Sequence, residues 1–166
     1  MKKISLSLVF LSFFFLLNSC QVEKPKVQIE PIVQKYLSVW NGGSLDSLDS
    51  IVSDNFEIRN GPTFESKIGR EALKKYITET RTAFPDFIVS GKQITLLGDT
   101  ALVALWSISG TYYNKENPSI VIPKTSSPGF SVIFFNDNKL TGEWIAYSDL
   151  SWYKGMGYEL TIPNKK

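Results

Sequence analysis

Histidine is absent from this chain of 166 residues, and cysteine occurs only once. The lack of histidine excludes a catalytic triad that uses it as the base and a zinc site that uses it as a ligand. The lack of a second cysteine excludes a disulfide within the chain, so the hydrophobic core must stabilise the fold. Any acid–base chemistry must therefore use Asp, Glu, Tyr or Lys. The sequence predicts no metal site and no cofactor.

The N-terminal segment has a charged start followed by a short apolar run. Lys2 and Lys3 precede residues 4–17, which are apolar apart from serines, and the segment ends in Leu-Asn-Ser-Cys at Cys20. The run is shorter than the roughly 20 apolar residues that a membrane-spanning helix needs. This pattern is typical of a secretory signal peptide. The segment has three possible interpretations: the leader of a protein that is lipidated at Cys20, a simple cleavable signal followed by a chance cysteine, or an N-terminal anchor helix.

Small residues before a single cysteine resemble the lipobox of bacterial lipoproteins. This resemblance implies cleavage before Cys20, acylation of that residue and export from the cytoplasm. Acylation would also consume the only thiol, which excludes a cysteine nucleophile. Gln21 is not the Asp that usually retains such proteins at the inner membrane. We therefore expect a lipid-anchored protein of the cell envelope, at the outer membrane.

The rest of the chain is expected to be a tether followed by one domain. Residues 1–19 are interpreted as the signal peptide, residues 20–27 as a charged, lipidated tether, and residues 28–166 as a single domain. Without residues 1–19, basic and acidic side chains are equal in number. A near-neutral chain gives no electrostatic reason to expect nucleic acid as a partner.

Helical periodicity is confined to the first part of this domain. Apolar residues at i, i+3, i+4, i+7, i+8 and i+11 predict a helix that begins near Ile29 and ends before Gly42. A shorter helix is expected after Ser44, whose hydroxyl can cap it. A third helix is predicted over residues 69–83, because Pro85 cannot continue it.

From residue 86 onward the apolar pattern alternates as in β-strands. Residues 87–97 and 101–113 predict a hairpin, and residues 130–135 and 140–149 predict two further strands. Residues 130–135 are apolar on both parities, so that strand should be covered on both faces. The helices supply one cover, and a second copy of the chain is expected to supply the other. The pattern indicates an α+β domain with an antiparallel sheet packed against three N-terminal helices.

Short motifs occur along the domain in a characteristic order. They are WNG at residues 40–42, GREALKKYI at 69–77, AFPDF at 83–87, GDTALVALWSISGT at 98–111 and NKLTGEW at 138–144. Together they resemble the SnoaL-like polyketide cyclases of the nuclear-transport-factor-2-like superfamily, over roughly residues 28–158. The resemblance implies a cone-shaped fold, in which the sheet wraps around the helices and leaves a deep apolar pocket between them.

The resemblance also implies a catalytic residue. The cyclases have an Asp shortly after the Trp of the final strand, which moves a proton at an activated carbon, and Asp149 matches it. Two histidines of the cyclases are replaced here, one by Ser131 and one by Tyr112. Family members often have a Glu two residues before the Trp, where this chain has Gly142 and places Glu143 one position later.

The spacing between Trp144 and Asp149 leaves the orientation of Asp149 open. The two residues are five positions apart, one more than in the family, so a regular strand would place them on opposite faces. A β-bulge between them would turn Asp149 into the pocket. In a regular strand, Ser148 would face the pocket instead.

Aromatic side chains predict the walls of the pocket. Trp106, Ile108 and Tyr112 share one parity of the middle strand. With Trp144 and Ser148 they are expected to line an apolar cavity of the kind that holds small molecules.

Three functions remain open on the sequence alone, and whether any reaction is catalysed is not decided. The first is a membrane-anchored, homodimeric lipoprotein that binds a small apolar molecule without catalysis, which the lack of histidine and the shifted Asp149 favour. The second is a cyclase- or isomerase-like enzyme that uses Asp149 for proton transfer. The third is a dimeric scaffold at the envelope. The segment 149–160 is expected either to close the pocket or to lie on the dimer surface.

Overall fold

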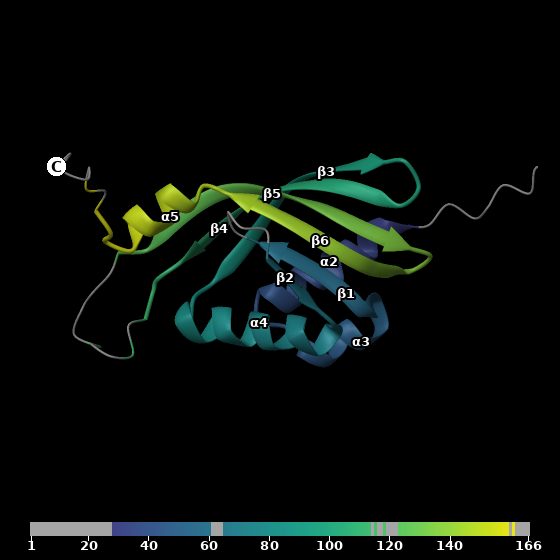
Figure 1. Ribbon diagram of the computed structural model, residues 1–166, viewed down its shortest axis with the longest axis horizontal. Coiled ribbons are helices and arrows are strands. Elements are labelled where there is room, and N and C mark those ends of the chain that lie inside the picture. Colours follow the sequence, from purple (N-terminus) through teal and green to yellow (C-terminus); the bar gives the residue numbers. More distant parts are fainter. Residues whose placement is uncertain are drawn as a thin grey trace, which may run out of the picture.

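The computed structural model describes residues 28–60, 65–113, 115, 118, 123–159 and 161. A curved sheet lies against a layer of helices (Figure 1), which confirms the predicted α+β class. The helices are α2 (Ile29–Trp40), the 3₁₀ helix η2 (Leu45–Ser47), α3 (Leu48–Ile51), α4 (Arg70–Ala83) and α5 (Asp149–Gly155). The strands are β1 (Val52–Asn60), β2 (Glu65–Ile68), β3 (Ile88–Leu97), β4 (Ala101–Gly110), β5 (Thr125–Asn136) and β6 (Lys139–Tyr147).

The N-terminal helices begin and end where their sequence signals predict. α2 buries Tyr36 and Trp40 on its apolar side, and the chain turns after it at Gly42, whose φ of +98° favours glycine. Ser44 Oγ accepts a hydrogen bond from the backbone N–H of Asp46 at 3.3 Å and so caps η2. These signals are local, which is why the sequence places the helices well.

In the described part of the chain, the sheet has six strands in the order β2-β1-β6-β5-β4-β3. Neighbouring strands are antiparallel except β1 and β6, which run parallel and correct the expectation of a wholly antiparallel sheet. Register shifts interrupt three of the pairings, β1 with β6, β3 with β4, and β5 with β6. Bulges of this kind bend and twist a sheet, and the sheet curves over the helices as a result.

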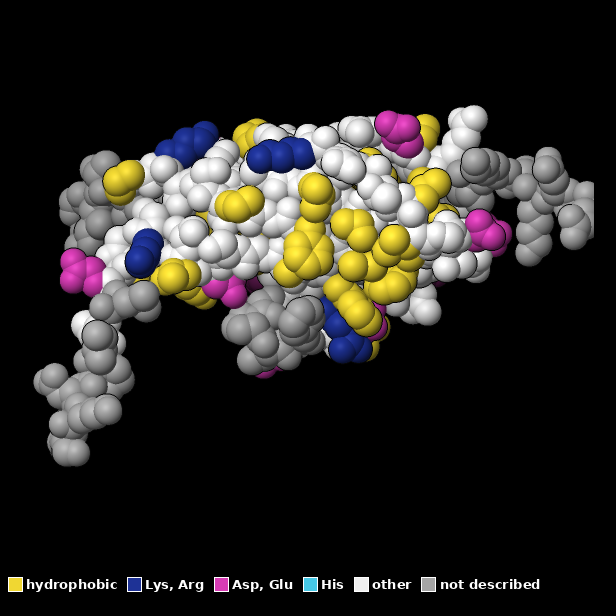
Figure 2. All heavy atoms as spheres, turned by 90° about the horizontal axis from the view of Figure 1, so that it is seen from above, with side chains coloured by type: hydrophobic (Ala, Val, Ile, Leu, Met, Phe, Trp, Pro, Cys, Tyr) yellow, Lys and Arg dark blue, Asp and Glu magenta, His cyan; other side chains and the backbone are white. Residues whose placement is uncertain are grey.

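Alternation divides the side chains of β4, β5 and β6 between two faces. We call the side that packs on the helices the inner face; its cross-strand rows are Leu102–Ile133–Glu143, Ala104–Ser131–Ile145 and Trp106–Gly129–Tyr147. The opposite side is the outer face, where Leu105, Phe130 and Trp144 are 41%, 45% and 44% exposed. Figure 2 looks onto the outer face, on which hydrophobic side chains gather in a patch.

The predicted signal peptide (1–19), the lipidation site Cys20 and the tether (20–27) lie outside the described residues. Within the described part of the chain, no helix has both the length and the apolar character that crossing a membrane requires.

Candidate functional site

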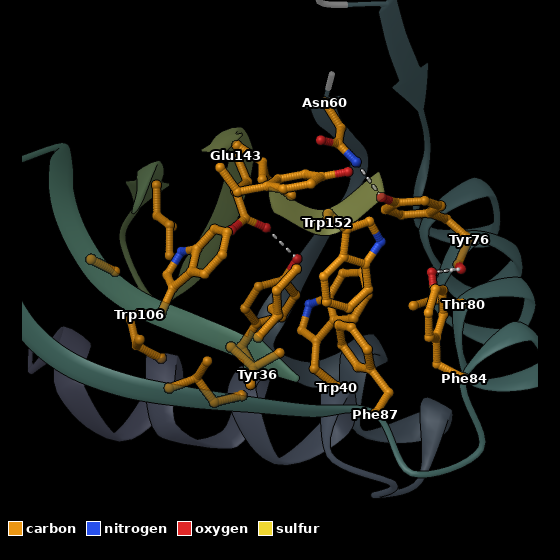
Figure 3. Close-up of a pocket in the computed structure, with 18 residues that line it drawn as sticks. Tyr36, Trp40, Asn60, Tyr76, Thr80, Phe84, Phe87, Trp106, Glu143 and Trp152 are labelled. Carbon is orange, nitrogen blue, oxygen red and sulfur yellow. Dashed lines mark hydrogen bonds between the residues drawn. The ribbon is translucent and has the colours of Figure 1, made fainter. Parts of the chain in front are cut away.

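A cavity of about 180 Å³ lies between the inner face of the sheet and helices α2 and α4 (Figure 3). Most of the side chains around it are aliphatic or aromatic. The lining residues are Val33, Tyr36, Leu37, Trp40, Asn60, Tyr76, Thr80, Phe84, Phe87, Val89, Ala104, Trp106, Ile108, Ile133, Glu143, Ile145, Tyr147 and Trp152. Because an apolar enclosure strengthens electrostatic interactions, its few polar groups determine what it can do.

The polar centre of the cavity is the carboxyl group of Glu143 on β6. Tyr36 of α2 donates a hydrogen bond from its hydroxyl to Glu143 Oε2 at 2.7 Å (Figure 3). Ser131 of β5 accepts a hydrogen bond from Trp106 Nε1 at 2.9 Å, so a tryptophan of β4 joins the same network. Burial raises the pKa of Glu143, and hydrogen bonding by Ser131 and Tyr36 partly opposes that rise. Four elements of the fold therefore position one carboxyl group.

A second polar group lies where β1 faces α4. Asn60 Nδ2 donates a hydrogen bond to the hydroxyl of Tyr76, as Figure 3 shows. Burial raises the pKa of Tyr76 to about 12, so this phenol is neutral at physiological pH. Asn60 Oδ1 is buried and has no hydrogen-bond partner among the described residues. An acceptor in this condition is available to a bound molecule.

The short helix α5 closes one end of the cavity with Trp152. The side chain of Trp152 is buried, with its ring centroid 4.9 Å from that of Phe84 and 6.5 Å from that of Tyr147. The first of the two expectations for the C-terminal segment, that it covers the pocket, agrees with this position.

The predicted pocket residues fall into two groups. Trp106 and Ile108 line the cavity. Tyr112 does not line it; it follows the end of β4 and packs on Phe84, with ring centroids 5.5 Å apart. Ser148 follows the end of β6, where its hydroxyl donates a hydrogen bond to Ser151 Oγ at 2.9 Å, and it does not line the cavity either.

Trp144 lies on the outer face, opposite to the expectation. It packs there against Phe134, with ring centroids 5.2 Å apart. β6 pairs regularly with β5 from Glu143 to Tyr147, so these two residues share the inner face and Trp144 cannot. The side of β6 that faces the cavity is therefore that of Glu143, one position before Trp144, and the assumption that Trp144 marks it was wrong.

Asp149 is the first residue of α5 and does not line the cavity. No register shift occurs between Trp144 and Tyr147, so the bulge that would turn Asp149 inward is absent from the paired part of β6. An acidic side chain in the first turn of a helix is favourable because of the helix dipole. Burial is the main cause of the raised pKa of Tyr147, and the charge of Asp149 adds to it. A catalytic role for Asp149 stays a prediction, with its side chain outside the cavity.

Glu143 is the site residue that sequence reasoning missed. It was left out of the predicted pocket because the pocket was assumed to lie on the Trp144 side of the strand. One signal pointed to it. Tyr36 belongs to the inward stripe of α2, and a tyrosine hydroxyl that becomes buried needs a hydrogen-bond partner.

The arrangement offers one buried carboxyl group within aromatic walls. Such a group can accept hydrogen bonds, exchange a proton with a bound molecule or neutralise a positive charge on it. Within the described residues, no three His, Cys, Asp or Glu side chains come together as a metal site would require.

Comparison with known proteins gives a family and a fold. Residues 30–154 match the sequence model of a family described as SnoaL-like polyketide cyclase. No match was found among the curated proteins.

Solved structures with a similar fold share little sequence with this chain. A proposed polyketide cyclase from Acidithiobacillus ferrooxidans has a TM-score of 0.67 at 21% identity, over 81% of this chain and 97% of the other. IdmH, a proposed polyketide cyclase from Streptomyces antibioticus, has a TM-score of 0.67 at 14% identity, over 79% and 99%. A protein from Catenulispora acidiphila with a ketosteroid isomerase-like fold, solved in complex with trimethylamine, has a TM-score of 0.65 at 16% identity, over 77% and 93%.

Proposed function

Because the chain belongs to the SnoaL-like polyketide cyclase family, we propose that its cavity binds a small, mainly apolar molecule without catalysing a reaction. The observation that carries this proposal is the cavity of about 180 Å³ beneath the inner face, which has largely aliphatic and aromatic walls and, in the part of the chain that the structure describes, Glu143 as its one carboxyl group. Burial of apolar surface contributes about 25 cal/mol per Å² to binding such a ligand. The Glu143 carboxyl orients it. The trimethylamine complex of the Catenulispora protein is an example of this fold holding a small organic molecule.

Binding without turnover is favoured by how the carboxyl group is held. Glu143 is hydrogen-bonded to Tyr36, and among the described residues the lining contains no Lys, Arg, Cys or Asp that would exchange protons with it. The tyrosines of the lining are weak acids whose raised pKa values keep them neutral. Among the described lining residues, Glu143 thus has the only carboxyl group, and burial raises its pKa.

An isomerase- or cyclase-like activity is the second candidate, and the position of Glu143 is the observation that favours it. A buried carboxyl group with a raised pKa is suited to proton transfer, and it faces the cavity where Asp149 does not. In this alternative Glu143 takes the role that the family resemblance assigned to Asp149. Exchange of the α-protons of a cyclic ketone with deuterated water tests it. Exchange catalysed by the wild type and lost in Glu143→Gln would replace the binding proposal with an enzymatic one.

The binding proposal is tested by native mass spectrometry of the protein extracted from membranes in a mild detergent. We expect a non-covalent small molecule on the wild type. Ala104→Phe, which fills the cavity from β4, should remove it, whereas Ala146→Phe, the same change on the outer face of β6, should retain it. Cavity binding would be contradicted if both variants retained the same small molecule, or if the wild type carried none.

The lipid anchor and the homodimer belong to the same proposal. Anchoring at Cys20 follows from the N-terminal sequence, and its test is whether Cys20→Ser still enters the membrane fraction. Dimerisation through the outer face is supported by the exposed apolar side chains of Leu105, Phe130 and Trp144. Sedimentation should detect a dimer that Trp144→Glu dissociates. A wild type that stays monomeric at micromolar concentration would remove the dimer, and with it the envelope scaffold.

A further inference from the structure

The lining of the cavity has an unbalanced charge. Among the 18 described residues that line it, Glu143 is the only one with a formally charged side chain, and none is Lys or Arg. Lys67 of the exposed strand β2 is not part of the lining, and its Nζ lies 5.0 Å from the ring centroid of Tyr76. The buried carboxyl group therefore has two hydrogen-bonding neighbours, Tyr36 and Ser131, but no counter-ion among the described residues of the lining.

Aromatic rings surround the same space at several angles. Eight of the lining residues are aromatic: Tyr36, Trp40, Tyr76, Phe84, Phe87, Trp106, Tyr147 and Trp152. The ring planes of Tyr36 and Trp40 meet at 90° and those of Trp40 and Tyr76 at 82°, so the faces of these rings do not all stack on one another. The face of an aromatic ring carries negative electrostatic potential and attracts cations, most strongly where water is excluded.

The cavity also has a spare hydrogen-bond acceptor. Asn60 Oδ1 is buried without a partner among the described residues, while the amide nitrogen of Asn60 is occupied by Tyr76. Figure 3 shows Asn60 and Glu143 at the same side of the cavity. A ligand that donates N–H groups would satisfy both acceptors, which a hydrocarbon or an ether would leave unpaired.

We propose that the molecule held in the cavity is an organic amine, bound as an ammonium ion with a compact apolar body, and that Glu143 is its counter-ion. The inference rests on the proposed function, since it names the chemical class of the ligand that the cavity binds. The aromatic rings enclose the apolar body and the positive charge, and Asn60 accepts a second hydrogen bond from the nitrogen. An anionic ligand is disfavoured because it would meet the carboxylate of Glu143 with no cation beside it.

Binding is coupled to one proton. A neutral amine takes the proton of the Glu143 carboxyl group: the O–H bond breaks, an N–H bond forms, and an ammonium–carboxylate pair results. An ammonium ion that enters from water instead displaces the carboxyl proton to solvent. The other titratable groups that face the cavity are Tyr36 of α2, Tyr76 of α4 and Tyr147 of β6. Burial raises the pKa of each, so they keep their protons while Glu143 titrates.

The experiment compares three probes that share a six-membered ring and differ in charge: cyclohexylamine, cyclohexanol and cyclohexanecarboxylate. Each is titrated by calorimetry into the full-length protein in mild detergent at neutral pH. We expect cyclohexylamine to bind at least about tenfold more tightly than cyclohexanol, and the carboxylate not to bind. Glu143→Gln should abolish the preference for the amine and keep the affinity for cyclohexanol, which also shows that the variant is folded. Glu79→Gln, an exposed change on α4 outside the cavity, should behave like the wild type.

A measurement on the wild type makes the test independent of that variant. In buffers of different ionisation enthalpy, binding of cyclohexylamine at mildly acidic pH should release protons, and its affinity should rise with pH as Glu143 ionises. Cyclohexanol bound as tightly as the amine, or a preference for the amine that survives Glu143→Gln, would overturn the amine and leave the proposed apolar-ligand function standing. Failure of all three probes to bind would overturn both.

Discussion

The inner and outer faces of the sheet differ sharply in the burial of their side chains, although the same strands form both faces. On β4, Trp106 is 7% exposed and turns inward, while the preceding Leu105 is 41% exposed and turns outward. On β6, Glu143 is 6% exposed inside, while Trp144 is 44% exposed outside. Both faces are rich in apolar side chains. Among the described residues, only the inner face is covered by helices and contains a buried side chain that can carry a charge.

This contrast shows that the position of a residue in the alternation of its strand, more than its chemical type, determines whether its side chain faces the cavity. A tryptophan is the natural choice for a buried pocket wall and a glutamate for the surface, yet β6 places them the other way round. Hydrogen bonding by Tyr36 and Ser131 allows the glutamate to be buried. Exposure of the tryptophan leaves a patch that a second copy of the chain would cover.

The largest effect is expected from truncating matched leucines on the two faces of β4. Leu102 is fully buried on the inner face, so Leu102→Ala should lower the free energy of unfolding by about 2–5 kcal/mol. Leu105→Ala, three residues later on the outer face, should cost less than about 1 kcal/mol in the monomer. Denaturant unfolding at low protein concentration measures both. Equal losses would show that the outer face is as well packed as the inner one.

A smaller loss of stability is expected from a substitution at Gly129, which packs against Trp106 on the inner face. A Cβ atom added at Gly129 would lie 2.3 Å from ring carbons of Trp106 and 2.7 Å from the carbonyl oxygen of Ala146. Gly129→Ala should therefore destabilise the fold by about 1–3 kcal/mol through overpacking. In a Trp106→Phe background the same change should cost less, because the smaller ring relieves part of the clash. An undiminished cost there would mean that the ring is not the obstacle.

Local signals made the helices and strands predictable, whereas the site depended on long-range pairing. The stripe of α2, the cap at Ser44 and the alternation after Pro85 each operate within a few residues, and they gave the α+β fold. The parallel pairing of β1 with β6 and the short strand β2 have no comparable local signal, and both were missed.

The same limit explains the partial success at the pocket. Trp106 and Ile108 line the cavity because alternation along β4 puts both on the inner face. The parity of β6 was taken from a family spacing that this chain does not keep. A single-residue error there moved Glu143 out of the predicted site and Trp144 into it. The α5 helix begins at Asp149, the residue at which the last strand was expected to end.

The pH dependence of stability should reveal the buried carboxyl group of the inner face. Burial raises the pKa of Glu143, so the folded protein keeps a proton that the unfolded chain has already lost above the ordinary carboxyl pKa of about 4.3. The free energy of unfolding should therefore fall as pH rises from that value through the raised pKa. In Glu143→Gln this fall should vanish. The difference between the two proteins isolates Glu143 from Asp49 and Asp86, whose pKa values are lowered.

The smallest effect is expected from Asp149→Asn. The residue lies in the first turn of α5, outside the cavity, so the variant should lose only about 0.3–1 kcal/mol of favourable interaction with the helix dipole. Affinity for cyclohexanol and cyclohexylamine should stay as in the wild type. A loss of affinity much larger than the loss of stability would restore Asp149 to the site.

The contrast between the faces is tested most directly by locating a bound apolar molecule. Crystals soaked with bromobenzene would reveal it through the anomalous signal of bromine. We expect the bromine peak inside the cavity, in contact with Trp106 and Trp152, and its loss in crystals of Ala104→Phe. A peak found only on the outer face, beside Phe130 and Trp144, would contradict the assignment of the binding site to the inner face.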